Sequence, residues 1–142
     1  MKVKFVKVHE DAKLPYRATP DAACSDLYSV ERVEVRQGQT VKIDTGLQVG
    51  EIPEGHYLAI FDRSGMRAKG VFGSSVGVID QDFRGVLKVI LYNSSKDILL
   101  IKPGERIAQC SLEKVLPVSY EFTETFTDTE RSSGGFGSTG LK

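Results

Sequence analysis

Short runs of hydrophobic residues, separated by turn residues, recur along most of the chain. Many of their members are β-branched, which favours extended backbone over helix. Glycine, proline, asparagine and serine stand between the runs at the spacing typical of a sandwich or barrel, so the pattern predicts an all-β fold. The expected strands are residues 3–8, 33–35, 41–49, 57–61, 86–92, 98–101, 107–112 and 118–122.

One stretch departs from this strand pattern. The sequence SGMRAK, which begins at Ser64, has helix-compatible residues over more than one turn, and Gly70 follows it. Because glycine commonly ends a helix, we expect one short helix here.

The C-terminal end has a different composition from the rest of the chain. Residues 123–142 include four glycines and eight serines or threonines, which is typical of a flexible segment. We therefore divide the chain into a β domain, residues 1–122, and a flexible C-terminal arm, residues 123–142. On composition alone the arm is an ordinary terminus, yet Arg131 and Phe136 are unusual side chains to leave without a partner.

Length and charge indicate one folded domain without a polyanionic partner. The chain has 142 residues, of which 40% are hydrophobic, and its nineteen basic residues balance nineteen acidic ones. No overall field attracts nucleic acid or a membrane, and we expect neither as a partner. Two distant cysteines, Cys24 and Cys110, make structural zinc or a disulfide framework improbable. Lysines interrupt the apolar residues after Met1, so we expect a cytoplasmic or other intracellular soluble protein.

Two loops carry residues suited to binding an anion. Residues 62–65 place Arg63 and Ser64 before the expected helix, where a guanidinium and backbone N–H groups could bind one phosphate. The simpler alternative is an ordinary helix N-cap by Ser64. In residues 104–110, Gln109 is unusual for either face of a strand, which indicates a polar contact.

A third loop, residues 77–85, is acidic. Its sequence GVIDQDFRG contains an apolar strand, an acidic turn and a returning strand, which predicts a β-hairpin. Asp80 and Asp82 could bind a divalent cation or supply a general base. The alternative is an acidic hairpin tip with no function beyond solubility.

Taken in order, these loops resemble the five motifs of the trimeric dUTPases, the deoxyuridine triphosphate nucleotidohydrolases. Residues 21–28 (DAACSDLY) are similar to the first motif, residues 63–66 to the second and residues 77–85 to the third. Residues 104–109 are similar to the fourth motif, and residues 131–140, with GGFGSTG complete, to the fifth. The resemblance covers nearly the whole chain and implies a jelly-roll-like barrel or sandwich.

The resemblance implies a reaction and roles for individual residues. The family hydrolyses dUTP to dUMP and pyrophosphate by Mg²⁺-assisted attack of water at the α-phosphorus. Asp80 corresponds to the general base, and Asp26 to the residue that holds Mg²⁺ through water. The implied substrate contacts are Arg63, Ser64, Gly65 and Gln109 for phosphates, Gly77, Val78, Ile79 and Phe83 for the nucleoside, and Arg131, Phe136, Gly137, Ser138 and Thr139 in the arm.

The resemblance also implies a homotrimer whose active sites are shared between subunits. The first, second and fourth motifs of a site come from one chain, the third from a second chain and the arm from a third. The third motif would pair with the uracil edge and leave no room for a methyl group at carbon 5, which excludes thymine by overpacking. The Phe83 ring occupies the position from which the family excludes a ribose 2′-hydroxyl.

Five residues depart from the usual family pattern. The family usually has glycine at Cys24, proline at Asp62, alanine at Arg67, tyrosine at Phe83 and glycine at Ser132. None of these changes removes a catalytic group. Asp62 beside Arg63 weakens the attraction for phosphate, and Arg67 is a candidate for local compensation.

Two other functions fit parts of the sequence. A dCTP deaminase has a similar fold and binds a related nucleotide, although GGFGSTG and GVIDQDFRG follow the dUTPase pattern. A regulatory or structural protein built on the same scaffold is the second alternative. The intact set of Asp26, Arg63, Asp80 and Arg131 favours catalysis over both.

Overall fold

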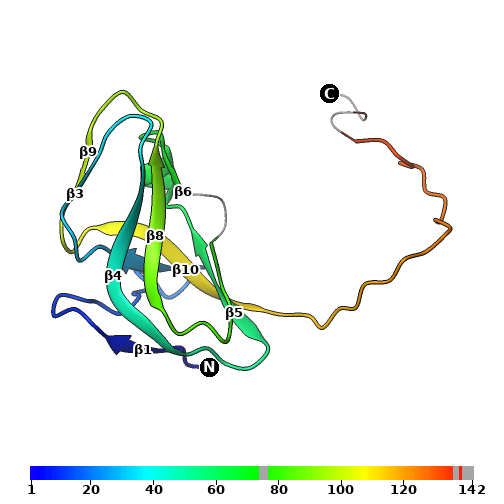
Figure 1. The fold of residues 1–142 in the computed structure, drawn as a ribbon, viewed down its shortest axis with the longest axis horizontal. Helices are drawn as coiled ribbons and strands as arrows, with labels where there is room; N and C mark the ends of the chain where they lie inside the picture. The colour runs from blue at the N-terminus through cyan, green and yellow to red at the C-terminus, as the bar shows by residue number, and fades with distance from the viewer. Residues whose placement is uncertain (74–76, 136–137, 139–142) are drawn as a thin grey trace.

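The computed structural model describes residues 1–73, 77–135 and 138, in which it places ten strands and one short helix, α1 (Ser64–Arg67). Figure 1 shows the strands gathered into one body, from which the chain after the last strand runs outward. The prediction of an all-β fold with one short helix is confirmed. The strands are β1 (Lys4–Lys7), β2 (Ser25–Tyr28), β3 (Val33–Val35), β4 (Thr40–Glu51), β5 (His56–Phe61), β6 (Val71–Gly73), β7 (Gly77–Ile79), β8 (Val86–Asn93), β9 (Leu99–Ile101) and β10 (Arg106–Lys114).

Two four-stranded antiparallel sheets enclose the hydrophobic core. One has the strand order β1-β4-β8-β6 and the other β2-β10-β5-β7, while β3 and β9 form a separate two-stranded ribbon. On β8, Leu87, Val89 and Leu91 are buried, and the core cluster that contains them also contains Leu58 and Ile60 of β5. Because alternate residues of a strand point to opposite faces, each sheet directs one apolar face inward. The result is the jelly-roll-like sandwich that was expected.

The helix is a single turn between β5 and β6. Arg63 is its N-cap residue and makes no side-chain cap hydrogen bond, and Ser64 is the first helical residue. The alternative reading of Ser64 as an N-cap is therefore wrong. Gly70, at φ +75°, follows the helix as the sequence predicted. In the part of the chain that the structure describes, no helix is long and apolar enough to cross a bilayer.

Residues 77–85 do not form the predicted hairpin. β7 pairs with β5, whereas β8 pairs with β4 and β6, so the acidic turn connects two different sheets. The local pattern indicated both strands but contains no information about their partners. β2 was not predicted as a strand because Ser25 and Asp26 give it a polar beginning, and β6 is a short addition to the edge of its sheet.

The strand predicted at residues 118–122 is absent. Val118, Tyr120 and Phe122 alternate as a strand requires, but all three are exposed, and residues 115–135 contain no strand. Every residue from 115 to 133 is exposed, and Figure 1 shows this segment leaving the body beyond β10. The alternation fails to produce a strand because no sheet edge of the same chain lies beside the segment.

Candidate active site

A buried carboxylate between two arginines marks one edge of the second sheet. Asp26 on β2 is only 9% exposed. Its Oδ1 lies 2.7 Å from Nε of Arg63, and its Oδ2 lies 3.3 Å from Nη1 of Arg106. A buried carboxylate without a partner is strongly destabilising, so these ion pairs fix all three side chains. The arrangement brings the first, second and fourth predicted motifs together.

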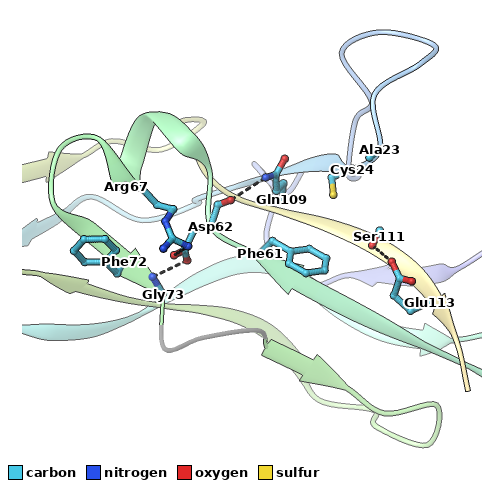
Figure 2. Close-up of a pocket in the computed structure, with 10 residues that line it drawn as sticks. All are labelled: Ala23, Cys24, Phe61, Asp62, Arg67, Phe72, Gly73, Gln109, Ser111 and Glu113. Carbon is cyan, nitrogen blue, oxygen red and sulfur yellow. Dashed lines mark hydrogen bonds and ion pairs between the residues drawn. The ribbon is translucent and has the colours of Figure 1, made fainter. Parts of the chain in front are cut away.

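Gln109 joins the same cluster through the backbone. Gln109 is on β10, where it lies opposite Asp26 of β2 and opposite Phe61 of β5. Its Nε2 donates to the carbonyl oxygen of Asp62 at 2.8 Å. Figure 2 shows Gln109 and Asp62 on the wall of a cleft of about 820 Å³. The predicted polar contact of Gln109 is therefore made with the loop that carries Arg63, Ser64 and Gly65.

Asp80 lies on the exposed turn that follows β7. The N–H of Phe83 donates to the carbonyl oxygen of Asp80 at 3.1 Å, and the guanidinium of Arg84 donates to the carbonyl oxygens of Gln81 and Phe83. The Phe83 ring lies against Gly85, where any Cβ would overlap it. These contacts give the turn a defined shape and leave the side chain of Asp80 exposed.

Asp80 and Asp26 are far apart within one chain. They belong to opposite ends of the sheet order β2-β10-β5-β7, three interstrand spacings apart. The register places Asp26 level with Phe61 and Ile79 level with Leu58, so Asp80 also lies further along the strands. Spacings of about 4.8 Å between strands and about 3.3 Å per residue give a separation of roughly 20 Å. One chain does not unite the two carboxylates in one site.

The arm contributes no contact to this cluster among the described residues. Nε of Arg131 donates to the carbonyl oxygen of Gly134 at 2.9 Å, so its recorded partner is in the arm itself. Ser132 adopts φ +44°, a left-handed conformation that favours glycine, the usual family residue there. Ser138 is part of a turn. The predicted contacts Phe136, Gly137 and Thr139 lie outside the described residues.

The two cysteines lie near each other, on either side of the β2–β10 pairing. Cys110 pairs with Ser25, the residue after Cys24, and both thiols are free. Burial, with smaller contributions from Cys24 and Asp26, raises the pKa of Cys110 to about 12. Cys110 therefore stays a neutral core residue, while Cys24 lines the cleft beside Gln109.

The donor set suits a magnesium ion held mainly by a substrate. No group of three or more histidine, cysteine, aspartate or glutamate side chains able to hold a metal occurs among the described residues. Mg²⁺ prefers phosphate oxygens, water and one or two carboxylates to an all-protein cage. Both oxygens of Asp26 already have arginine partners, but a carboxylate has about four lone-pair sites and can still accept a hydrogen bond from water.

Sequence reasoning missed Arg106 and the side-chain role of Asp62. Arg106 could have been found from the requirement that a buried Asp26 carboxylate has cationic partners. For Asp62, the sequence named Arg67 as a candidate charge partner, and the structure places the two side chains 3.5 Å apart. The hydrogen bond from the Gly73 N–H gave no such signal, because it depends on the tertiary fold.

Fold and site together define a jelly-roll-like protein with a cationic cluster at one end of a sheet. The dUTPase family profile matches residues 10–140. A deoxyuridine 5′-triphosphate nucleotidohydrolase of a Hydrogenobaculum species is 44% identical and is covered over 100% of both chains. The deoxyuridine 5′-triphosphate nucleotidohydrolase of Paramecium bursaria Chlorella virus 1 is 41% identical over 95% of each chain. The chain belongs to the dUTPase family.

A solved structure agrees with the assignment. The dUTPase of Staphylococcus bacteriophage 80alpha in complex with dUpNHpp is similar with a TM-score of 0.86 and 25% sequence identity, covering 99% of each chain. The likeness in fold extends over nearly the whole length of both chains.

Proposed function

We propose that this protein hydrolyses dUTP to dUMP and pyrophosphate by attack of water at the α-phosphorus. The observation that carries the proposal is the family match over residues 10–140. The 80alpha dUTPase bound to the substrate analogue dUpNHpp supports the choice of nucleotide. The position of each motif in the fold supports the individual roles that follow.

The phosphate end of the site is built from Arg63, Ser64, Gly65 and Gln109. Asp26 orients the Arg63 guanidinium, and the Gln109 side chain is tied to the backbone of the same loop. Oriented donors lose little freedom on binding, so they suit a triphosphate whose charge must be neutralised during reaction. In the arm, Arg131, Ser138 and the backbone at Gly137 and Thr139 are assigned to the γ-phosphate.

The nucleoside end is assigned to the segment from β7 to the acidic turn. β7 is the terminal strand of its sheet, so alternate residues among Gly77, Val78 and Ile79 direct N–H and C=O groups away from β5. Such groups can pair with the edge of uracil, and a close backbone excludes the thymine methyl by overpacking. The Phe83 ring faces the sugar, and Phe136 is assigned to the uracil ring.

Asp80 is the proposed general base. Its exposed carboxylate can accept a proton from the attacking water while the water oxygen bonds to the α-phosphorus. The bond from that phosphorus to the bridging oxygen breaks, and the electron pair leaves with pyrophosphate. A bound Mg²⁺ would neutralise phosphate charge, with Asp26 holding it through water.

We infer that the working form is a homotrimer with shared sites. The separation of roughly 20 Å between Asp26 and Asp80, estimated from strand spacing and register, leaves each chain with an incomplete site. The exposed apolar residues after β10, including Leu116, Val118, Tyr120 and Phe122, are also more numerous than a free terminus needs. A second and a third chain would supply the missing residues and cover this segment.

Hydrolysis in isotope-labelled water tests the reaction. Heavy oxygen is expected in dUMP, because the attacked atom is the α-phosphorus. Label recovered in pyrophosphate would overturn the position of attack. The same assay run with dUTP, dCTP, dTTP and UTP should show pyrophosphate release from dUTP above all, while ammonia release from dCTP would instead establish a deaminase.

Replacing the proposed base gives a second test. Asp80→Asn should lower kcat by about 100-fold or more, because a general base acts in the transition state. The dissociation constant for a non-hydrolysed dUTP analogue should change little, since other groups bind the nucleotide. Asp82→Asn is the matched control and should retain most activity. Nearly normal turnover by Asp80→Asn would show that another residue is the base.

A further inference from the structure

Asp62 is held on three sides in the cleft drawn in Figure 2. Its Oδ1 accepts a hydrogen bond from the Gly73 N–H at 2.6 Å, and its Oδ2 lies 3.5 Å from Nη1 of Arg67. Its carbonyl oxygen accepts the hydrogen bond from Gln109 at 2.8 Å. One residue thus connects the end of β5, the last residue of α1, the end of β6 and a residue of β10.

These contacts link the two sheets at the proposed phosphate site. β5 and β10 belong to one sheet and β6 to the other. The carboxylate approaches Gly73 so closely that a Cβ there would overlap Oδ1. Arg63 and Ser64 follow Asp62 directly, so a displacement of Asp62 would move the residues proposed to contact phosphate.

Arg67 balances the charge of Asp62 in the same cleft. The carboxylate side chain is 12% exposed and the guanidinium side chain 62% exposed. The Arg67 guanidinium also lies 5.6 Å from the centroid of the Phe72 ring, a cation–π contact that favours this orientation. Without Arg67, a negative charge would stand unpaired beside the residues assigned to a polyanionic substrate.

We propose that Asp62 and Arg67 are a positioning pair for the phosphate-binding loop. The Asp62 carboxylate anchors the start of the loop that carries Arg63 and Ser64 through the hydrogen bond from Gly73, and the Asp62 carbonyl oxygen accepts the hydrogen bond from Gln109. Arg67 neutralises Asp62, so the loop gains its anchor without repelling the triphosphate. The inference rests on the proposed function, because it assumes that Arg63, Ser64 and Gln109 contact the phosphates of dUTP.

Charge balance is tested with Arg67→Ala and Asp62→Asn/Arg67→Ala. The single variant should raise KM for dUTP by about five-fold at low salt with kcat nearly unchanged, and added salt should reduce the difference. The double variant should return KM toward the wild-type value, because asparagine keeps an oxygen for the Gly73 N–H and carries no charge. Arg67→Lys should keep KM for dUTP close to the wild-type value, because lysine retains the positive charge beside Asp62. Arg36→Ala, which removes an exposed arginine directly after β3 in the separate two-stranded ribbon, is the control.

Positioning is tested by comparing Asp62→Ala with Asp62→Asn. The alanine variant loses the hydrogen bond to Gly73 and should lower kcat by about ten-fold, whereas the asparagine variant should stay closer to wild type. Thermal unfolding of each variant separates loss of folded enzyme from a change in kinetics.

Several outcomes would overturn the proposal that Asp62 and Arg67 position the phosphate-binding loop. An unchanged KM in Arg67→Ala, with or without a lower Tm, would make its role structural only. An equal rise in KM in the single and double variants would mean that Arg67 contacts phosphate directly. Equal kcat values in Asp62→Ala and Asp62→Asn would show that the hydrogen bond from Gly73 does not position the phosphate-binding loop. Absence of dUTP hydrolysis by the wild-type protein would instead refute the proposed function, and this inference with it.

Discussion

At the scale of single residues, the site depends on how buried polar groups are paired. Asp26 has two arginine partners, one at each carboxylate oxygen, which compensate its buried charge. Cys110 needs no such partner, because its buried thiol is neutral.

The raised pKa of Cys110 predicts a loss of stability in alkali. Burial raises this pKa from 9.0 to about 12, so between these values the unfolded chain releases a proton that the folded chain keeps. The free energy of unfolding should be unaffected by this group below pH 9 and should fall above it, by at most about 1.4 kcal/mol per pH unit. Urea denaturation at several pH values would measure the slope.

Other groups also titrate in this range, so the comparison is between variants. Cys110→Ala should flatten the decline between pH 9 and 12, while Cys24→Ala should keep the wild-type slope. Identical slopes in wild type and Cys110→Ala would contradict the assignment.

At the scale of elements, β4 is one continuous strand whose pairing with β8 is irregular where it bends past the N-terminal segment. Its pairing with β8 shifts register between Asp44 and Gln48, and Gly46 lies inside this interval at φ +68°. The Gly46 N–H donates to Oδ1 of Asp44 at 2.6 Å, and the N–H of Val8 donates to the Gly46 carbonyl oxygen. The bend lets one long strand pair with both β1 and β8.

Two glycine substitutions separate conformational strain from crowding. A Cβ on Gly46 would lie 2.7 Å from Cβ of His9 and 2.8 Å from Cβ of Ala12, whereas one on Gly38, at φ +76°, would meet nothing within 4 Å. Gly38→Ala should cost about 1–2 kcal/mol from backbone strain alone. Gly46→Ala should cost about 3–5 kcal/mol, because overpacking adds to the same strain.

Urea denaturation at one fixed protein concentration would measure both losses, since the proposed assembly would make stability depend on concentration. Equal losses for the two variants would mean that the segment around His9 and Ala12 moves aside freely.

Most strands could be predicted from the sequence, but their partners could not. Residues 86–92 and 107–112 were expected as strands and correspond to β8 and β10, because β-branched residues and alternation are local signals. The pairing of β7 with β5 depends on contacts distant in sequence. The segment 118–122 has the alternation of a strand and yet lacks a partner in its own chain.

The candidate site also contains residues that could be predicted from the sequence and contacts that could not. Asp26, Arg63 and Gln109 could be singled out from the sequence through their order and resemblance, and the fold brings them together. The contact of Arg106 with Asp26 and that of Gly73 with the Asp62 carboxylate arise only through tertiary structure. Their roles could not be read from spacing.

At the scale of the whole molecule, the proposed site combines residues that lie far apart within one chain. A chain ending at Thr129 should keep its fold and its Tm, because the residues it lacks make no contact with the β body among those described. It should hydrolyse dUTP poorly, since it lacks Arg131, Phe136 and the glycine N–H groups. Size-exclusion chromatography, calorimetry and pyrophosphate release would measure these properties.

Mixed assemblies test the sharing itself. Asp80→Asn chains and chains ending at Thr129 would be unfolded together and refolded. Some sites would then combine an intact Asp80 from one chain with an intact arm from another. The dUTP-hydrolysing activity of the mixture should therefore exceed the summed activities of the two parent proteins. No recovery, despite confirmed mixing of chains, would place both elements on the same subunit.

The exposed tyrosine beyond β10 gives the protein a built-in optical reporter. The chain has no tryptophan and five tyrosines, so tyrosine dominates its intrinsic fluorescence. Tyr120 is 91% exposed on the segment that leaves the body. In the proposed trimer this segment packs against another subunit, which would move the phenol from water to an apolar surface. The proposed assembly should therefore change the emission of the unlabelled protein, and a Tyr120→Phe variant would identify the part of the signal that belongs to this residue.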